Sequence, residues 1–75
     1  MAGNGPLPEG GNQVPGEELA ALQLLARGYS VEQIARLLHT APSDVHARLD
    51  RVMLRLSAAS RQQAVAIALR LDLIV

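Results

Sequence analysis

The residues of this sequence best suited to chemistry are arginines spaced along one segment. Arg48, Arg51 and Arg55 recur at intervals of three and four residues, which places them on one stripe of a helix. Arg36 and Arg61 precede and follow this stripe and are expected to flank it. Guanidinium groups are permanently charged and donate hydrogen bonds in a fork that fits phosphate oxygens. The pattern favours contacts to a phosphate backbone, which give affinity but little choice of base sequence.

The same arginines also fit a solvated helix edge that is paired with nearby acids. Asp44 precedes Arg48 by four residues, a spacing that favours an acid–base pair on a helix. Residues 27–61 contain six arginines and three carboxylates, a local charge of +3. The whole chain has seven arginines, no lysine and seven acidic residues, so its net charge is zero. A neutral chain is unusual among nucleic-acid-binding proteins, and the sequence leaves both interpretations open.

Other kinds of site lack the necessary residues. The chain has two histidines, His39 and His46, and no cysteine, which is too few ligands for a metal site. Nothing resembles a Ser/His/Asp set, a glycine-rich phosphate loop or a cleft with paired carboxylates, so we expect no enzyme and no cofactor. Tyr29 is the single aromatic residue and cannot form a base-stacking surface. The lack of cysteine, of a signal peptide and of a long apolar run favours the cytoplasm over a membrane.

Helices are the elements that must position these residues. Glycine and proline are concentrated at the start of the chain, which predicts a flexible tail over residues 1–15 and one all-α domain over residues 16–75. The apolar spacing predicts four helices, at about residues 16–27, 30–38, 42–56 and 61–71. Gly28 should end the first helix, and Ser30 and Ser60, each followed by glutamine three residues later, should form capping boxes.

The last predicted helix is apolar on two sides, which suggests more than one partner. The third helix has a single core stripe made of Val45, Leu49, Val52 and Leu56. In the last helix, one stripe is assigned to the domain's own core and consists of Val65, Ala68 and Leu69. The second stripe is expected to form a two-fold contact with another copy of the chain and consists of Ala64, Ile67, Leu71 and Ile74. The alternative is that both stripes are partly buried within one chain.

Taken together, residues 17–75 resemble the LuxR-type (GerE-like) helix-turn-helix domain. The matching residues are Gly28-Tyr29-Ser30, Ile34-Ala35, Leu38, Val45, Leu49, Val52, Leu56, Arg61, Ala64-Val65 and Leu73-Ile74. The resemblance implies a four-helix fold that binds double-stranded DNA, regulates transcription and uses the third helix for recognition. The DNA contacts expected from the residues and the resemblance are Arg36, Ser43, His46, Ala47, Arg48, Asp50, Arg51, Arg55 and Arg61.

The departures from the family pattern fall on the predicted recognition helix. Ala41 replaces the usual serine cap, Asp44 a threonine, His46 a lysine and Arg48 a histidine. Asp50 stands where the family often has a basic residue, although a carboxylate can accept a hydrogen bond from the cytosine amino group. The alternative function is therefore an interaction or dimerisation module that keeps the helix-turn-helix fold, has lost ordinary DNA binding and pairs with itself or another protein.

Overall fold

The computed structural model describes residues 14–75 of the chain. Within this range the chain forms four helices and no strand: α1 (Gly16–Ala26), α2 (Val31–Leu37), α3 (Pro42–Arg55) and α4 (Arg61–Arg70). The predicted all-α class and all four helices are confirmed, and each observed boundary lies within one or two residues of the predicted one. None of the helices over residues 14–75 has the length and apolar character needed to cross a membrane.

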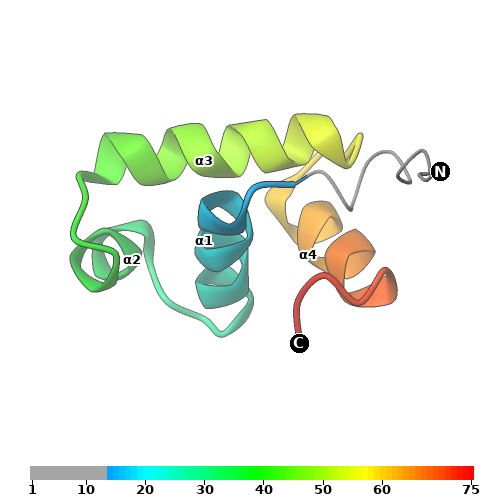
Figure 1. Cartoon of the computed structure of the whole chain (residues 1–75), viewed down its shortest axis with the longest axis horizontal. Helices are drawn as coiled ribbons and strands as arrows, with labels where there is room; N and C mark the ends of the chain where they lie inside the picture. The colour runs from blue at the N-terminus through cyan, green and yellow to red at the C-terminus, as the bar shows by residue number, and fades with distance from the viewer. Residues whose placement is uncertain (1–13) are drawn as a thin grey trace, which may run out of the picture.

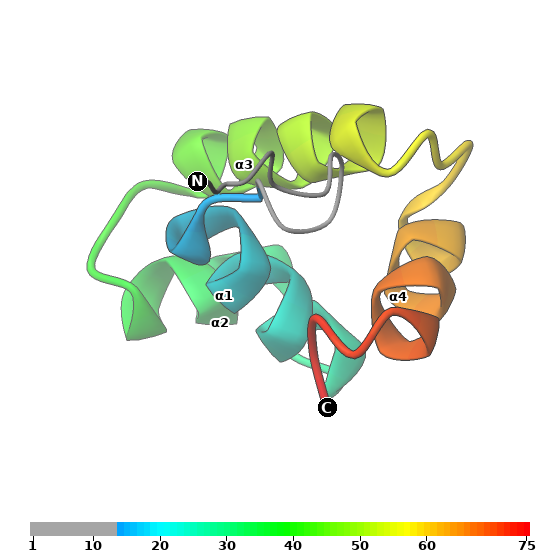
Figure 2. The same cartoon turned by 45° about the vertical axis from the view of Figure 1, so that its right-hand side comes forward.

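The long helix α3 lies across one side of the molecule, and the other three helices lie beneath it (Figure 1). α1 stands between α2 and α4 and contacts both, while α3 packs against all three (Figure 2). The tight turn after α2 leads directly into α3, which is the arrangement of a helix-turn-helix unit. α1 and α4 support α3 from below and leave its opposite side to solvent.

Local signals at the helix ends explain where each helix begins. Ser30 caps α2, since its hydroxyl accepts from the Gln33 N–H at 3.1 Å and the Gln33 side chain accepts from the Ser30 N–H at 2.8 Å, so the predicted capping box is confirmed. The second box is only half formed. Ser60 accepts from the Gln63 N–H at 3.0 Å, but the Gln63 side chain accepts from the N–H of Ala59 instead of Ser60.

The core lies where the faces of the four helices meet. Leu22, Ile34, Val45, Leu49 and Val52 are fully buried at its centre. The predicted stripe of α3 is confirmed, because Leu56 is buried as well. Among residues 14–75, one charged residue shares this interior: Glu18 on α1 is only 2% exposed, and Arg55 on α3 donates to its carboxylate at 2.8 Å.

The predicted faces of α4 were only partly right: Ala68 is buried as predicted and Val65 packs against the core, but two other residues were assigned to the wrong side. Ala64 and Ala68 are both buried against the core, whereas Leu69, which we expected in the core, is 45% exposed. Because alanine is small, α4 can approach α1 closely along the Ala64–Ala68 side, and this decides which of two apolar stripes is buried. Ala64 therefore cannot contribute to a contact with a second chain.

The end of the chain folds back on the core and gives a second correction. Ile74, which we expected at a dimer contact, is buried. The Gln23 side chain of α1 holds the neighbouring Val75 by two hydrogen bonds, one from the Val75 N–H at 2.9 Å and one to the Val75 carbonyl. Of the four residues predicted at the dimer contact, only Leu71 is exposed and Ile67 is partly buried against the core.

The start of the domain lies slightly earlier than predicted. Val14, which we placed in the flexible tail, is buried with the core, and Pro15 occupies the N-cap position of α1. The rest of the predicted tail, residues 1–13, lies outside the described residues.

Candidate nucleic-acid interface

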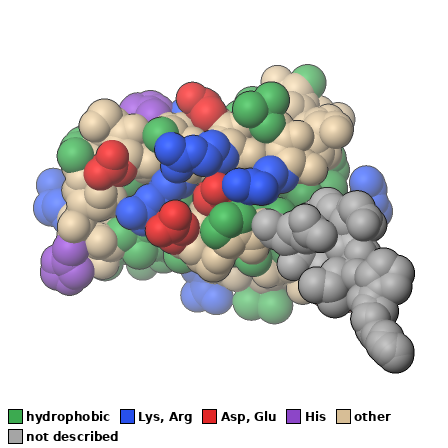
Figure 3. All heavy atoms as spheres, turned by 45° about the horizontal axis from the view of Figure 1, so that its top comes forward, with side chains coloured by type: hydrophobic (Ala, Val, Ile, Leu, Met, Phe, Trp, Pro, Cys, Tyr) green, Lys and Arg blue, Asp and Glu red, His purple; other side chains and the backbone are tan. Residues whose placement is uncertain are grey.

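The solvent side of α3 carries the polar residues that the sequence assigns to DNA. Ser43, His46, Asp50 and Arg51 are exposed, and Ala47 and Arg48 are partly buried along the same helix. Figure 3 turns the α3 side of Figure 1 toward the viewer and shows arginine side chains in the middle of this face, between and beside carboxylates. The face is therefore a mixture of both charges rather than a uniformly positive surface.

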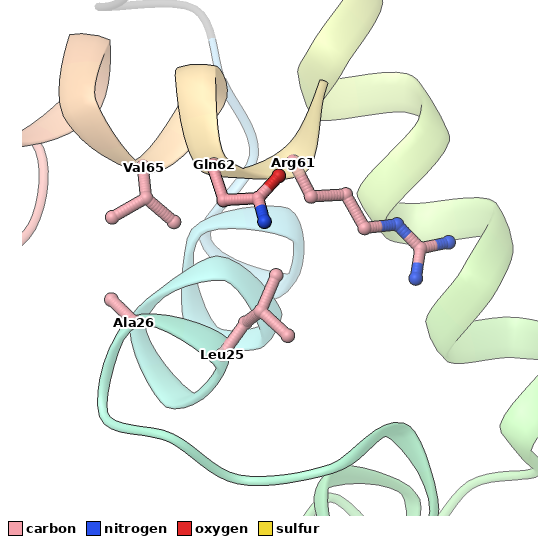
Figure 4. A pocket seen from close by; sticks show the side chains of 5 residues that line it. All are labelled: Leu25, Ala26, Arg61, Gln62 and Val65. Carbon is pink, nitrogen blue, oxygen red and sulfur yellow. The ribbon is translucent and has the colours of Figure 1, made fainter.

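Two of the predicted phosphate-binding arginines already have partners within the domain. Arg55 donates through Nε and Nη2 to both carboxylate oxygens of the buried Glu18, at 2.8 and 3.4 Å. Arg61, the first residue of α4, extends toward α3 (Figure 4), where its Nη2 lies 2.9 Å from His46 Nδ1 and 3.8 Å from Asp50 Oδ1. Both arginines serve contacts between helices, which reduces the charge that they can offer to a phosphate.

The other arginines near α3 are available. Arg48 and Arg51 on α3 and Arg36 on α2 form no ion pair with a carboxylate among residues 14–75. The predicted alternative, an ion pair between Asp44 and Arg48, is not formed. Asp44 instead accepts a hydrogen bond from the Thr40 hydroxyl at 2.6 Å, across the start of α3. The positive charge that faces solvent on α2 and α3 therefore comes mainly from three guanidinium groups.

The apolar residues of the site also divide into two groups. Leu54, on the solvent side of α3, is 80% exposed and lies one and two turns beyond Asp50 and Ala47. A second group surrounds an open hollow of about 490 Å³ between the end of α1 and the start of α4, lined by Leu25, Ala26, Arg61, Gln62 and Val65 (Figure 4). Among the described residues, no three metal-ligating side chains lie together.

Sequence reasoning missed the roles of Glu18 and Arg61. Glu18 lies in the first turn of α1, where an acidic residue ordinarily complements the positive N-terminal end of the helix. However, it lies three and four residues before Ala21 and Leu22, on the buried side of α1, and this position indicates a carboxylate that needs a partner. Arg61 contacts His46 and Asp50, which precede it by 15 and 11 positions, and no local pattern predicts these contacts.

The short α2, the tight turn and the exposed side of α3 define the class of the domain, a four-helix helix-turn-helix domain. Residues 17–68 match the luxR family of bacterial regulatory proteins (GerE), and the chain belongs to this family. A comparison with curated proteins gives no match. The predicted resemblance is confirmed, and with it the general class of a DNA-binding domain that regulates transcription.

Proposed function

We propose that this domain binds double-stranded DNA by placing α3 in the major groove, with Arg36, Arg48 and Arg51 at the phosphates. The observation that carries the proposal is the set of three guanidinium groups on α2 and α3 that have no carboxylate partner among residues 14–75. Phosphate contacts fix the position of a helix in the groove, and a luxR-family helix-turn-helix supplies the shape that enters it.

The test compares two double variants of equal charge. Arg48→Ala with Arg51→Ala removes two of the proposed phosphate contacts. Arg27→Ala with Arg70→Ala removes two exposed arginines at the ends of α1 and α4. At about 0.1 M salt we expect the first pair to weaken binding to any duplex by roughly tenfold or more, because each lost contact also removes a counterion-release term. The control pair should change binding far less, and equal losses in the two variants would refute the assignment to α3.

We also propose that the domain pairs through the solvent side of α4. Gln62, Ala66 and Leu69 lie on this side, opposite the buried Ala64 and Ala68. Val65 lies one turn before Leu69 and lines the hollow beside α1. A two-fold axis next to α4 would let Leu69 of each chain enter the hollow of the other, which buries apolar surface on both sides. This surface replaces the one predicted from sequence.

A second candidate function is a protein-interaction module, which is favoured by Leu54. A leucine that is 80% exposed near the C-terminal end of the solvent-facing side of α3 suits an apolar partner as well as a thymine methyl group. The module requires no arginine for its contact. If duplex binding is weak and equal in the two double variants above, the interaction module becomes the better description.

A further inference from the structure

Arg61 connects two side chains on the solvent side of α3. Its Nη2 lies 2.9 Å from His46 Nδ1 and 3.8 Å from Asp50 Oδ1, and these residues stand one helical turn apart. A guanidinium group has only donors, so Nδ1 is the acceptor in this contact, which requires the tautomer of His46 with its proton on Nε2. One residue of α4 thus sets the tautomer of His46 and partly balances the charge of Asp50.

Asp50 keeps hydrogen-bonding capacity that this network does not use. Its side chain is 69% exposed, and the ion pair with Arg61 is formed through Oδ1. Oδ2 has no hydrogen-bond partner among the described residues. Asp50 is therefore a pure acceptor, oriented by a neighbouring cation and placed in the middle of the helix proposed to enter the groove.

From this geometry, and on the basis of the proposed function, we infer that Asp50 selects cytosine and that Arg61 is its positioning residue. An ionised carboxylate in the major groove needs a donor, and only cytosine N4 and adenine N6 provide one. Adenine also presents the acceptor N7 beside its amino group, which repels a carboxylate, whereas cytosine presents no acceptor at its own edge. A carboxylate at this position therefore favours a C·G pair over the other three arrangements.

The role of Arg61 follows from charge. Without Arg61, Asp50 would stand among phosphates with no ion-pair partner within 4 Å among the described residues, and repulsion would oppose entry of α3 into the groove. With Arg61 Nη2 at 3.8 Å from Oδ1, part of that repulsion is offset and the side chain of Asp50 stays exposed to solvent. A basic residue at position 50 would attract DNA of any sequence. Asp50 beside Arg61 gives up that attraction and selects one base instead.

The experiment selects duplexes from a randomised pool with the full chain and sequences the bound fraction. The chain with Asp50 should enrich cytosine at one position of the site by about fivefold or more. Asp50→Asn should shift that position to adenine, because an asparagine amide pairs with both N6 and N7 of adenine. Asp50→Ala should lose the base preference at that position and keep the base preferences at the other positions of the site. Asp72→Asn, which removes an exposed carboxylate beyond the end of α4, should retain cytosine.

Arg61 is tested in the same pools by Arg61→Ala and Arg61→Lys. We expect the alanine variant to lose most of the cytosine enrichment, and the lysine variant to retain part of it. A cytosine preference that is unchanged in Asp50→Asn would overturn the inference about Asp50, and one unchanged in Arg61→Ala would overturn the positioning role. Salt-sensitive binding without any base preference would overturn the inference and leave the proposed function standing. Absence of duplex binding in every variant would overturn both.

Discussion

Arg55 and Arg51 are close in sequence, yet they have different roles in the structure. Arg55 compensates the carboxylate of Glu18, which is 2% exposed and would otherwise lack a partner in the core. Arg51 is exposed and has no ion pair with a described carboxylate. A stripe of arginines that looks uniform in the sequence therefore divides into one residue that joins α1 to α3 and others that face solvent.

Arg55→Ala should consequently destabilise the fold. The buried Glu18 carboxylate would lose its charged partner, and an unsatisfied buried acceptor costs about 1–3 kcal/mol. Arg51→Ala is the matched control and should change the free energy of unfolding by less than about 0.5 kcal/mol. Urea denaturation of both variants measures the difference. Equal stability of the two variants would show that the Glu18–Arg55 pair contributes nothing to the fold.

The residue scale is also where sequence prediction was weakest. The buried side of α3 was predicted correctly, because Val45, Leu49 and Val52 recur at a helical spacing. The pairings of Arg55 with Glu18 and of Arg61 with His46 join residues that are distant in sequence. These pairings depend on how the helices cross, and the periodicity within one helix does not predict how two helices cross.

All four helices of the described chain end in the same backbone conformation. A residue with positive φ follows each helix: Gly28 (96°), His39 (56°), Ser57 (55°) and Asp72 (60°). In each case the next N–H bonds back to a carbonyl five residues earlier, for example from Ala58 to Met53 at 2.9 Å. Only the first of these ends has glycine, so the other three hold a side chain in the left-handed region.

Ser57→Gly should stabilise the domain. A left-handed conformation costs a residue with a Cβ about 1–2 kcal/mol, and glycine removes this cost. Glycine also gives the unfolded chain more conformational freedom, which offsets part of the stabilisation. The free energy of unfolding should therefore rise by roughly 0.5–1 kcal/mol. Ala66→Gly, at an exposed position inside α4, should instead destabilise by about 1 kcal/mol. Thermal melts measure both effects: the melting temperature should rise for Ser57→Gly and fall for Ala66→Gly. A lower melting temperature for Ser57→Gly would disprove this explanation of the turn.

Elements themselves were predictable from the sequence because their signals are local. Ser30, Pro42 and Ser60 mark where α2, α3 and α4 begin, and each signal depends on residues within one turn. The orientation of α4 was not predictable in this way. Both of its sides are apolar, and the choice between them depends on the fit of Ala64 and Ala68 against α1.

At the scale of the whole molecule, the corrected α4 surface makes a specific prediction about assembly. Leu69→Glu should convert the dimer into a folded monomer, because it places a charge in an apolar contact. Leu71→Glu is the control, since Leu71 is equally exposed but lies on another side of the helix. Sedimentation equilibrium distinguishes the outcomes. An unmutated chain that is monomeric at hundreds of micromolar, or a dimer broken only by Leu71→Glu, would contradict the proposed surface.

The most direct test of the central claim is the salt dependence of duplex binding by the unmutated chain. Three phosphate contacts per domain predict that log K falls with log salt concentration with a slope of about −2.7 per domain, or about −5.4 for a dimer. Arg48→Ala should make the slope shallower by about one unit for each domain bound. A slope near zero, or a steep slope that is unchanged when Arg48 and Arg51 are both replaced, would contradict the claim that α3 meets DNA through these arginines.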